Sequence, residues 1–287
     1  MKLALGTVQL GIPYGINNTN GVPTIEEIKR IFSVAEAGGI NVIDTAIAYG
    51  DAEQKIGRYS SDKFRIITKL PPFTEGQYSY NWLLDKVEGS LKRLQTGKLH
   101  GLLLHRPLQL EGNEGKKLLK DLQKLKLAGK VNKIGISIYE PSELDHIVNI
   151  NELDIVQTPF NIFDRRIIES GWLTKLSEKG IEVHARSVFL QGLLLVEASK
   201  RLPKFWPWNR LMSDYDHWLK NSGLTPLEAC IRFVLSFNEI TNVVVGIDNA
   251  NHLDEIITAS KGGSLFIPND ISSKDIKLIN PLSWLDF

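Results

Sequence analysis

The sequence predicts an α/β fold: one (β/α)8 TIM barrel over residues 1–287, with long loops after its first and seventh strands. Eight short β-type runs alternate with helical patterns from end to end. Several of these runs are apolar at consecutive positions, as expected of parallel strands that are buried on both faces. No break in composition divides the chain, so eight βα units favour one closed barrel over two domains.

The expected strands are all short. They lie at residues 3–8, 40–45, 65–69, 100–105, 133–138, 154–158, 182–187 and 242–247. A doubly wound sheet is the alternative, but it would leave two open edges. No G-x-G-x-x-G motif follows any of these runs to open a dinucleotide-binding turn, so the closed barrel is the preferred prediction.

Apolar residues recur at helical spacing between the strands. Thr24 begins one such pattern, with Glu27 three residues later as in a capping box, and Gly38 and Gly39 end it. Further helices are expected at residues 81–94, 114–128, 141–149, 170–179, 225–237 and 250–259. Residues 9–23 and 198–223 remain as the two long loops. Both follow strands, so we expect both at the mouth of the barrel.

Composition limits the classes of function. The balance of 43% hydrophobic and 23% charged residues is that of a globular protein with a large core. A formal net charge of +1 gives no electrostatic argument for nucleic acid or an anionic membrane as partner. No apolar stretch approaches the roughly 20 residues of a membrane span, and the first residues lack a signal-peptide pattern. The single cysteine, Cys230, lies in an apolar helical pattern as a buried thiol, and such sparse cysteine usage indicates a reducing, cytoplasmic location.

Four polar residues in the first third of the chain are the candidate catalytic group. Asp44, Lys69 and His105 each close an apolar run, and Tyr49 follows Asp44 by five residues. A barrel strand delivers a catalytic side chain to the mouth in this way. The carboxylate would hold the ammonium, the ammonium would lower the pKa of the phenol, and the imidazole would bind a carbonyl oxygen. Such a set suits carbonyl reduction, with hydride arriving from elsewhere.

Each of these residues also has a structural interpretation. Asp44 alone would be an N-cap, Lys69 a surface charge, Tyr49 a packed aromatic and His105 a hydrogen-bonded core histidine. Their order and their placement on successive strands favour the catalytic interpretation. A metal site is not expected, because the remaining histidines show no ligand-like spacing with Cys, Asp or Glu.

The runs DTAIAYG, ITK and LLLHRP, together with the opening LGTVQLG, resemble the aldo-keto reductase superfamily over essentially the whole chain. The resemblance implies NAD(P)H-dependent carbonyl reduction on a barrel. It makes Tyr49 the proton donor, with Lys69 and Asp44 tuning it and His105 orienting the carbonyl group.

The resemblance also implies a set of cofactor-binding residues. They are Thr7, Asp44, Ser137, Gln157, Arg186, Ser187, Gly192, Gly246, Asp248 and His252. Three positions depart from the family pattern: Ile138 replaces an asparagine, Arg186 replaces the tyrosine that stacks on nicotinamide, and Asp248 stands where a phosphate-binding residue is common. Asp248 would instead accept a hydrogen bond from a ribose 2′-hydroxyl, although the helix N-terminus at 249–252 suits a phosphate. The family favours NADP(H), the residues lean towards NAD(H), and both stay open.

The expected partner is a small-molecule carbonyl substrate, polar or anionic, such as a sugar derivative. Candidate pocket residues are Tyr14, Arg106, Trp206 and Trp208, although the two tryptophans would equally pin a long loop to the barrel. Two rival functions are a nucleotide-binding regulatory protein without turnover and an aldolase with Lys69 as Schiff-base lysine. Substrate, reaction direction and oligomeric state are not predicted.

Overall fold

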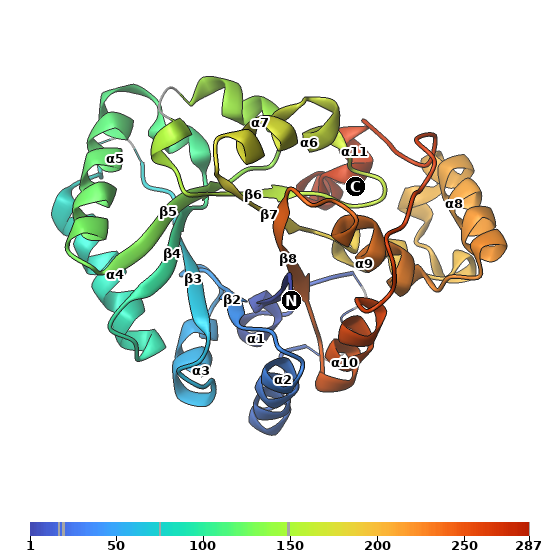
Figure 1. Ribbon diagram of the computed structural model, residues 1–287, viewed down its shortest axis with the longest axis horizontal. Helices are drawn as coiled ribbons and strands as arrows, with labels where there is room; N and C mark the ends of the chain where they lie inside the picture. Colours follow the sequence, from blue (N-terminus) through green and yellow to red (C-terminus); the bar gives the residue numbers. More distant parts are fainter. Residues whose placement is uncertain (17, 19–20, 75, 148–149, 287) are drawn as a thin grey trace.

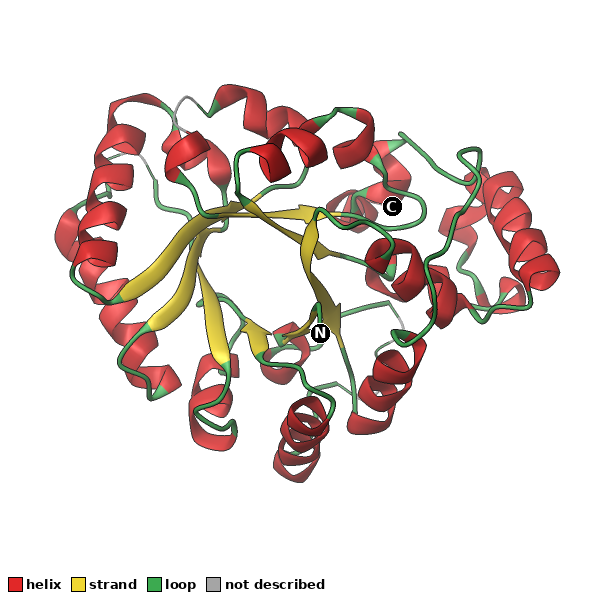
Figure 2. Ribbon diagram, viewed as in Figure 1, coloured by secondary structure: helices red, strands yellow, loops and turns green. Residues whose placement is uncertain are grey.

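The computed structural model describes residues 1–16, 18, 21–74, 76–147 and 150–286. Eight parallel strands follow one another around a closed barrel, and β8 pairs with β1 to complete it (Figures 1 and 2). The fold class predicted from the sequence is thereby confirmed. The strands are β1 (Leu3–Gly6), β2 (Val42–Asp44), β3 (Arg65–Leu70), β4 (Leu99–Leu104), β5 (Val131–Ser137), β6 (Ile155–Pro159), β7 (Glu182–Arg186) and β8 (Ile240–Gly246).

Helices cover the outside of the barrel (Figure 2). The α-helices are α1 (Val8–Gly11), α2 (Ile25–Ala37), α3 (Ala52–Tyr59), α4 (Tyr80–Leu94), α5 (Gly112–Leu127), α6 (Arg166–Glu169), α7 (Trp172–Glu178), α8 (Asn209–Ser222), α9 (Pro226–Leu235), α10 (Ala250–Ala259) and α11 (Ile276–Ile279). Short 3₁₀ helices are η1 (Pro107–Leu110), η2 (Pro141–His146), η3 (Ile150–Glu152), η4 (Leu190–Leu195), η5 (Ala198–Lys200), η6 (Pro203–Trp208) and η7 (Pro281–Asp286). The Thr24 hydroxyl accepts from the Glu27 amide at the start of α2, as the capping pattern predicts.

Several sequence-based boundaries were wrong. Strand β1 ends at Gly6 rather than at residue 8, because the chain turns at Thr7 into helix α1. The loop predicted at 198–223 consists largely of η5, η6 and α8. The helix predicted at 141–149 is the 3₁₀ helix η2, and its last two residues lie outside the described part of the chain. The pattern at 170–179 corresponds to α7 alone, which begins at Trp172.

The barrel interior contains a separate apolar cluster made of strand residues. Its members are Ala4, Val42, Ile67, Leu103, Ile155 and Val244. Side chains two residues apart on a strand point to the same face. The next inward positions towards the strand ends are therefore Gly6, Asp44, Lys69, His105, Gln157 and Gly246. This polar and glycine-rich layer lies directly above the apolar one and forms the floor of the barrel mouth.

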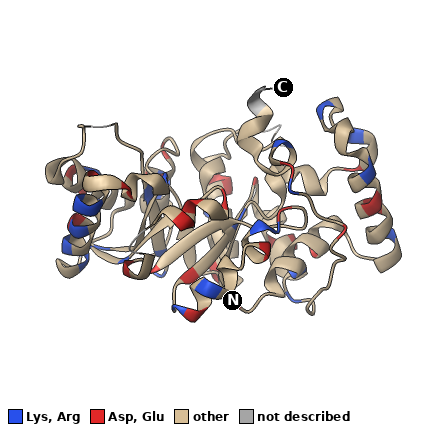
Figure 3. Cartoon of the chain, turned by 90° about the horizontal axis from the view of Figure 1, so that it is seen from above, with Lys and Arg blue, Asp and Glu red and all other residues tan. Residues whose placement is uncertain are grey.

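The outer surface carries charges of both signs, which lie mainly on the helices and loops (Figure 3). Within the described ranges, no helix combines the length and apolarity that crossing a membrane requires. Cys230 is fully buried in α9, as its sequence context predicts, and burial raises the pKa of its thiol to about 12. A thiol with this pKa is unreactive at neutral pH.

Candidate active site

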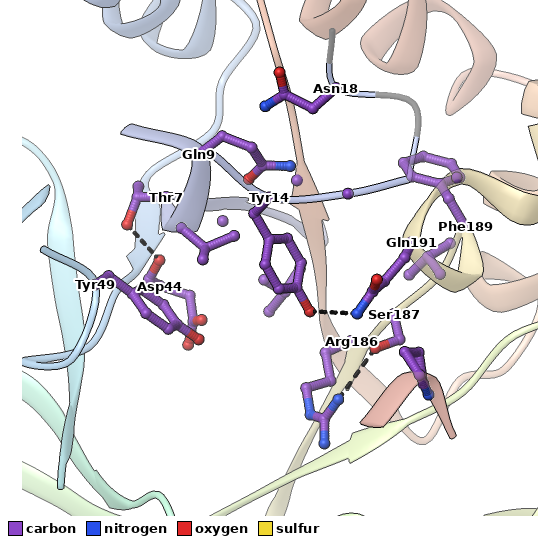
Figure 4. A pocket seen from close by; sticks show the side chains of 18 of the residues that line it. Thr7, Gln9, Tyr14, Asn18, Asp44, Tyr49, Arg186, Ser187, Phe189 and Gln191 are labelled. Atoms are coloured by element: carbon purple, nitrogen blue, oxygen red, sulfur yellow. Dashed lines mark hydrogen bonds between the residues drawn. The ribbon is translucent and has the colours of Figure 1, made fainter. Parts of the chain in front are cut away.

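A cavity of about 310 Å³ occupies the mouth of the barrel. It is lined by all four residues of the candidate catalytic group, by every predicted cofactor residue and by Tyr14. Figure 4 shows Tyr14, Asp44, Tyr49 and Arg186 among them. These residues are Thr7, Tyr14, Asp44, Tyr49, Lys69, His105, Ser137, Gln157, Arg186, Ser187, Gly192, Gly246, Asp248 and His252. Residues far apart in the sequence thus meet in one place.

Asp44 and Lys69 form a buried ion pair on the cavity floor. The Lys69 Nζ lies 2.5 Å from Asp44 Oδ1 and donates a second hydrogen bond of 3.0 Å to the Thr45 carbonyl. The other carboxylate oxygen of Asp44 accepts from Gln157 Nε2 at 2.7 Å, and Gln157 Oε1 in turn accepts from the Ser137 hydroxyl. A buried ion pair is stable when such bonds satisfy its remaining polar atoms. The Lys69 amine is therefore engaged, which disfavours the Schiff-base alternative.

Tyr49 and His105 lie above this pair. Their rings meet edge to face with centroids 5.9 Å apart, and Lys69 Nζ lies 5.4 Å from the centre of the Tyr49 ring. Burial, and next the Asp44 carboxylate, raise the pKa of the Tyr49 phenol well above its usual range. The sequence-based expectation of a lowered pKa was wrong, because desolvation and the Asp44 carboxylate outweigh the lowering effect of the Arg186 charge. Tyr49 therefore stays protonated at neutral pH, as a proton donor must.

The His105 imidazole is neutral at physiological pH. Burial, with a smaller contribution from the Lys69 charge, lowers its pKa to about 4. A neutral imidazole can donate one hydrogen bond to a carbonyl oxygen without competing for the proton that Tyr49 supplies.

Gly11 fixes the position of the Tyr49 backbone. A Cβ atom added to Gly11 would lie 1.8 Å from the Tyr49 carbonyl oxygen, so only glycine permits this approach of α1 to the loop after β2. The Tyr49 carbonyl also accepts from the Ala52 amide at the start of α3, at 3.0 Å. The glycine of the LGTVQLG opening thereby helps to hold the phenol over the cavity.

Arg186 presents a guanidinium to the cavity from the end of β7. It donates to the Ile138 carbonyl at 2.9 Å and to the Ser187 hydroxyl at 3.1 Å, and it stacks 4.8 Å from the centre of the Tyr139 ring (Figure 4). Arg106 stacks on the same ring, also at 4.8 Å. A guanidinium is well suited to stacking on a flat ring.

The segment after β7 is held in an uncommon backbone conformation. Ser187, Leu190 and Gln191 have positive φ angles of 58°, 47° and 52°. Such strain clusters at ligand sites. Two contacts tie the segment to the loop after β1: the Gln191 carbonyl accepts from the Ile16 amide at 3.2 Å, and Gln191 Nε2 donates to the Tyr14 hydroxyl at 3.0 Å (Figure 4).

The end of the cavity beyond β1 and β8 fits a polar ligand. Gly6 and Gly246 line its floor, and a Cβ on Gly246 would lie 2.6 Å from the Gln9 side chain, so glycine at this position makes room for Gln9. Gln9 Oε1 and Asp248 Oδ1 are buried there and find no hydrogen-bond partner among the residues that the structure describes. Buried polar atoms are nearly always paired in native proteins, so these two oxygens indicate a ligand that carries hydrogen-bond donors. The hydroxyl and amide groups of a nicotinamide nucleotide meet that requirement.

Three predicted pocket residues do not line this cavity. Arg106 is exposed and stacks on the Tyr139 ring, Trp206 is 62% exposed, and the Trp208 indole donates to Asp275 at 2.9 Å. The Trp208 contact matches the alternative interpretation, in which the tryptophan fixes a surface segment.

Other lining residues were not foreseen from the sequence. They are Gly6, Val8, Gln9, Gly15, Asn18, Tyr139, Val188, Phe189, Gln191, Leu195, Val244 and residues 280–282. Tyr139 directly follows the strand predicted at residues 133–138, a position from which it could have been proposed. Residues 280–282 carry no local signal, because tertiary contacts alone bring them to the mouth. Across the described residues, no group of three or more His, Cys, Asp or Glu could hold a metal ion.

The aldo/keto reductase family model matches residues 2–266. The chain belongs to this family. Its members are NAD(P)H-dependent oxidoreductases that act on carbonyl groups.

The relatives of this aldo/keto reductase are distant. An aldo-keto reductase of Bacillus subtilis is 30% identical over 183 residues, which cover 59% of this chain and 53% of that protein. The chain therefore matches about half the length of that relative. The L-glyceraldehyde 3-phosphate reductase of Escherichia coli is 23% identical over 298 residues, covering 90% of this chain and 84% of that one.

Solved structures share the fold of this aldo/keto reductase. The glycerol dehydrogenase of Gluconobacter oxydans has a TM-score of 0.71 at 23% identity, covering 92% of this chain and 88% of that one. The holo form of an aldo-keto reductase from Bacillus halodurans has a TM-score of 0.72 at 21% identity, with the same two coverages.

Proposed function

We propose that this protein reduces an aldehyde or ketone with a nicotinamide nucleotide, and that Tyr49 gives the proton to the carbonyl oxygen. The observation that carries the proposal is the cavity floor, where a protonated phenol lies between a neutral imidazole and a buried Lys69–Asp44 pair. Reduction places negative charge on the carbonyl oxygen. The phenol and the imidazole are the groups that would meet this charge.

Each residue has a distinct part in this proposal. Tyr49 transfers its proton, while His105 donates a hydrogen bond that orients the carbonyl group. Lys69 stabilises the phenolate that is left, and Asp44 holds Lys69 in place through the 2.5 Å contact. The bound nucleotide supplies the hydride. Asp44 is in turn held by Gln157, so Ser137 and Gln157 serve the ion pair as well as the cofactor end of the cavity.

NAD(H) fits the described residues better than NADP(H). Asp248 lines the cavity just after β8, and its Oδ1 has no hydrogen-bond partner among the described residues. This carboxylate would accept from a ribose hydroxyl and repel a 2′-phosphate. Burial raises the pKa of Asp248, and hydrogen bonds from a ribose would relieve this desolvation.

A polar carbonyl compound, such as a sugar derivative, is the proposed substrate class. Tyr14, Asn18 and Gln191 bring hydroxyl and amide groups to the cavity. Two matched proteins are named for substrates of this polar kind, L-glyceraldehyde 3-phosphate and glycerol.

Replacing Tyr49 tests the proposed function. The Tyr49→Phe variant keeps the ring but loses the proton, so we expect kcat for reduction of a carbonyl panel to fall by about 10² to 10⁴-fold. Nucleotide binding, followed by fluorescence titration, should persist. Tyr59→Phe is the matched control, since Tyr59 lies outside the cavity at the end of α3. Wild-type turnover in Tyr49→Phe, or nucleotide binding by the wild type without any turnover, would contradict the proposal.

A further inference from the structure

Arg186 brings a positive charge to the cavity that no carboxylate balances. Among the described residues, its hydrogen bonds go to neutral acceptors, the Ile138 carbonyl and the Ser187 hydroxyl, and no Asp or Glu forms an ion pair with it. The other cation of the cavity floor, Lys69, is neutralised by Asp44 at 2.5 Å. The stacked Tyr139 ring only partly stabilises the guanidinium. The net charge at this end of the cavity is therefore positive.

The Arg186 charge acts on the groups around the proposed reaction site. Burial dominates the pKa shifts of Tyr49, Lys69 and His105, and in all three the Arg186 charge adds a lowering contribution. Arg186 and these three residues line the same cavity. Any ring that exchanges hydride with a carbonyl group held at Tyr49 lies within the same field.

The charge of that ring changes during the reaction. Reduction moves a hydride, two electrons with one proton, from the reduced nucleotide to the carbonyl carbon, and the Tyr49 proton goes to the carbonyl oxygen. The ring is neutral in the reduced nucleotide and carries one positive charge in the oxidised one. A fixed cation nearby disfavours the positively charged ring, as it disfavours the protonated forms of Lys69 and His105.

We propose that Arg186 makes this cavity bind the reduced nicotinamide nucleotide more tightly than the oxidised one, so that the site is loaded for carbonyl reduction and releases the oxidised nucleotide readily. The inference rests on the proposed function. Arg186 would act as a specificity residue. With it, the cavity binds the reduced nucleotide tightly before the reaction and the oxidised nucleotide weakly after it. This effect depends only on the charge and position of Arg186, and it is the same for whichever face of the ring the guanidinium meets.

The test compares dissociation constants rather than turnover. Titrations of the intact protein with NADH and with NAD⁺, followed by protein fluorescence and calorimetry, give the ratio of Kd for the oxidised to the reduced form. We expect this ratio to exceed ten in the wild type and to fall about tenfold in Arg186→Gln, which is about 1.4 kcal/mol. Arg186→Lys keeps the charge, so its ratio should stay within about threefold of the wild type.

Arg106→Gln is the matched control, because Arg106 stacks on the same Tyr139 ring but is exposed and does not line the cavity. In this variant, the ratio of the dissociation constants for the oxidised and reduced nucleotides should differ less than twofold from that of the wild type. A wild-type ratio in Arg186→Gln, with both nucleotides bound, would overturn this inference and leave the proposed function intact. Failure of the wild type to bind NADH, NADPH, NAD⁺ or NADP⁺ would overturn both.

Discussion

Asp44, Lys69 and Gln157 each stand two residues beyond an apolar side chain that fills the barrel. These apolar residues are Val42, Ile67 and Ile155. Side chains two residues apart on a strand point to the same face, so these three polar side chains point into the barrel like the apolar ones before them. The sequence pattern alone therefore places them together on the floor of the cavity. Their contacts, including the bond from Gln157 to Asp44, depend on which strands become neighbours, and a single strand does not reveal this.

The neutral state of His105 predicts a pH dependence of stability. Its pKa is about 4 in the folded protein, against 6.5 for an unperturbed imidazole. As pH falls from 6.5 towards 4, the unfolded chain takes up a proton that the folded one does not, so stability is lost across this window. The loss amounts to at most about 1.4 kcal/mol per pH unit for one proton.

Urea unfolding at a series of pH values checks this expectation. The free energy of unfolding of His105→Asn should fall less steeply between pH 6.5 and pH 4 than that of the wild type. His217→Asn removes an exposed imidazole instead and should follow the wild-type slope. Parallel curves for wild type and His105→Asn would show that burial does not hold this histidine neutral.

At the scale of elements, the sequence predicts a helix well where an apolar stripe defines it. Helix α3 was missed because its inward face includes Glu53, which is buried by bonds to Thr68, Ser90 and Arg93. All three hydrogen-bond partners of this carboxylate lie far away in the sequence. From the sequence alone, Glu53 therefore cannot be distinguished from a solvent-exposed glutamate. Helix α8 follows a proline-rich segment that suggests a loop, although Met212, Tyr215 and Leu219 show helical spacing.

The start of helix α10 predicts which nucleotide binds more tightly. The Ala250 amide already donates to Glu27 Oε1 at 2.6 Å, and the His252 amide donates to Asn249 Oδ1 at 2.8 Å. With Asp248 just before them, the first turn of α10 offers a phosphate few free donors and two nearby carboxylates.

We therefore expect NADH to bind at least about fivefold more tightly than NADPH, a difference of about 1 kcal/mol. Asp248→Asn and Glu27→Gln should each reduce the ratio of the NADPH to the NADH dissociation constant, because each removes a negative charge that repels the 2′-phosphate of NADPH. The control is Glu26→Gln, an exposed carboxylate on the same first turn of α2. Fluorescence titrations give all eight constants, and tighter binding of NADPH by the wild type would contradict the argument.

At the scale of the whole molecule, the last residues complete the cavity. Residues 280–282 line the mouth, although they lie beyond the last strand by more than thirty positions. The sequence predicts the barrel and the ends of its strands because local patterns specify them. It does not predict this part of the wall, since the path of the tail is set by contacts with distant side chains.

Arg165 binds the start of the tail that leads to these residues. Arg165 is 6% exposed, and its guanidinium donates to the Ile267 and Ile271 carbonyls at 3.1 Å and stacks 4.8 Å from the centre of the Phe233 ring. Replacing Arg165 with Met would leave these carbonyls without donors in a buried site. Each unpaired buried group costs about 1–3 kcal/mol, so the free energy of unfolding should fall by about 2–4 kcal/mol.

The loss of stability should be local as well as global, because in Arg165→Met the tail would separate from the barrel before the strands unfold. Hydrogen exchange in Arg165→Met should rise over residues 265–282 more than in β1 to β8, and KM for the carbonyl substrate should rise with it. Lys274→Ala, an exposed change in the same segment, should alter stability by less than about 0.5 kcal/mol. Equal exchange in the tail of Arg165→Met and the wild type would show that other contacts hold this wall of the cavity in place.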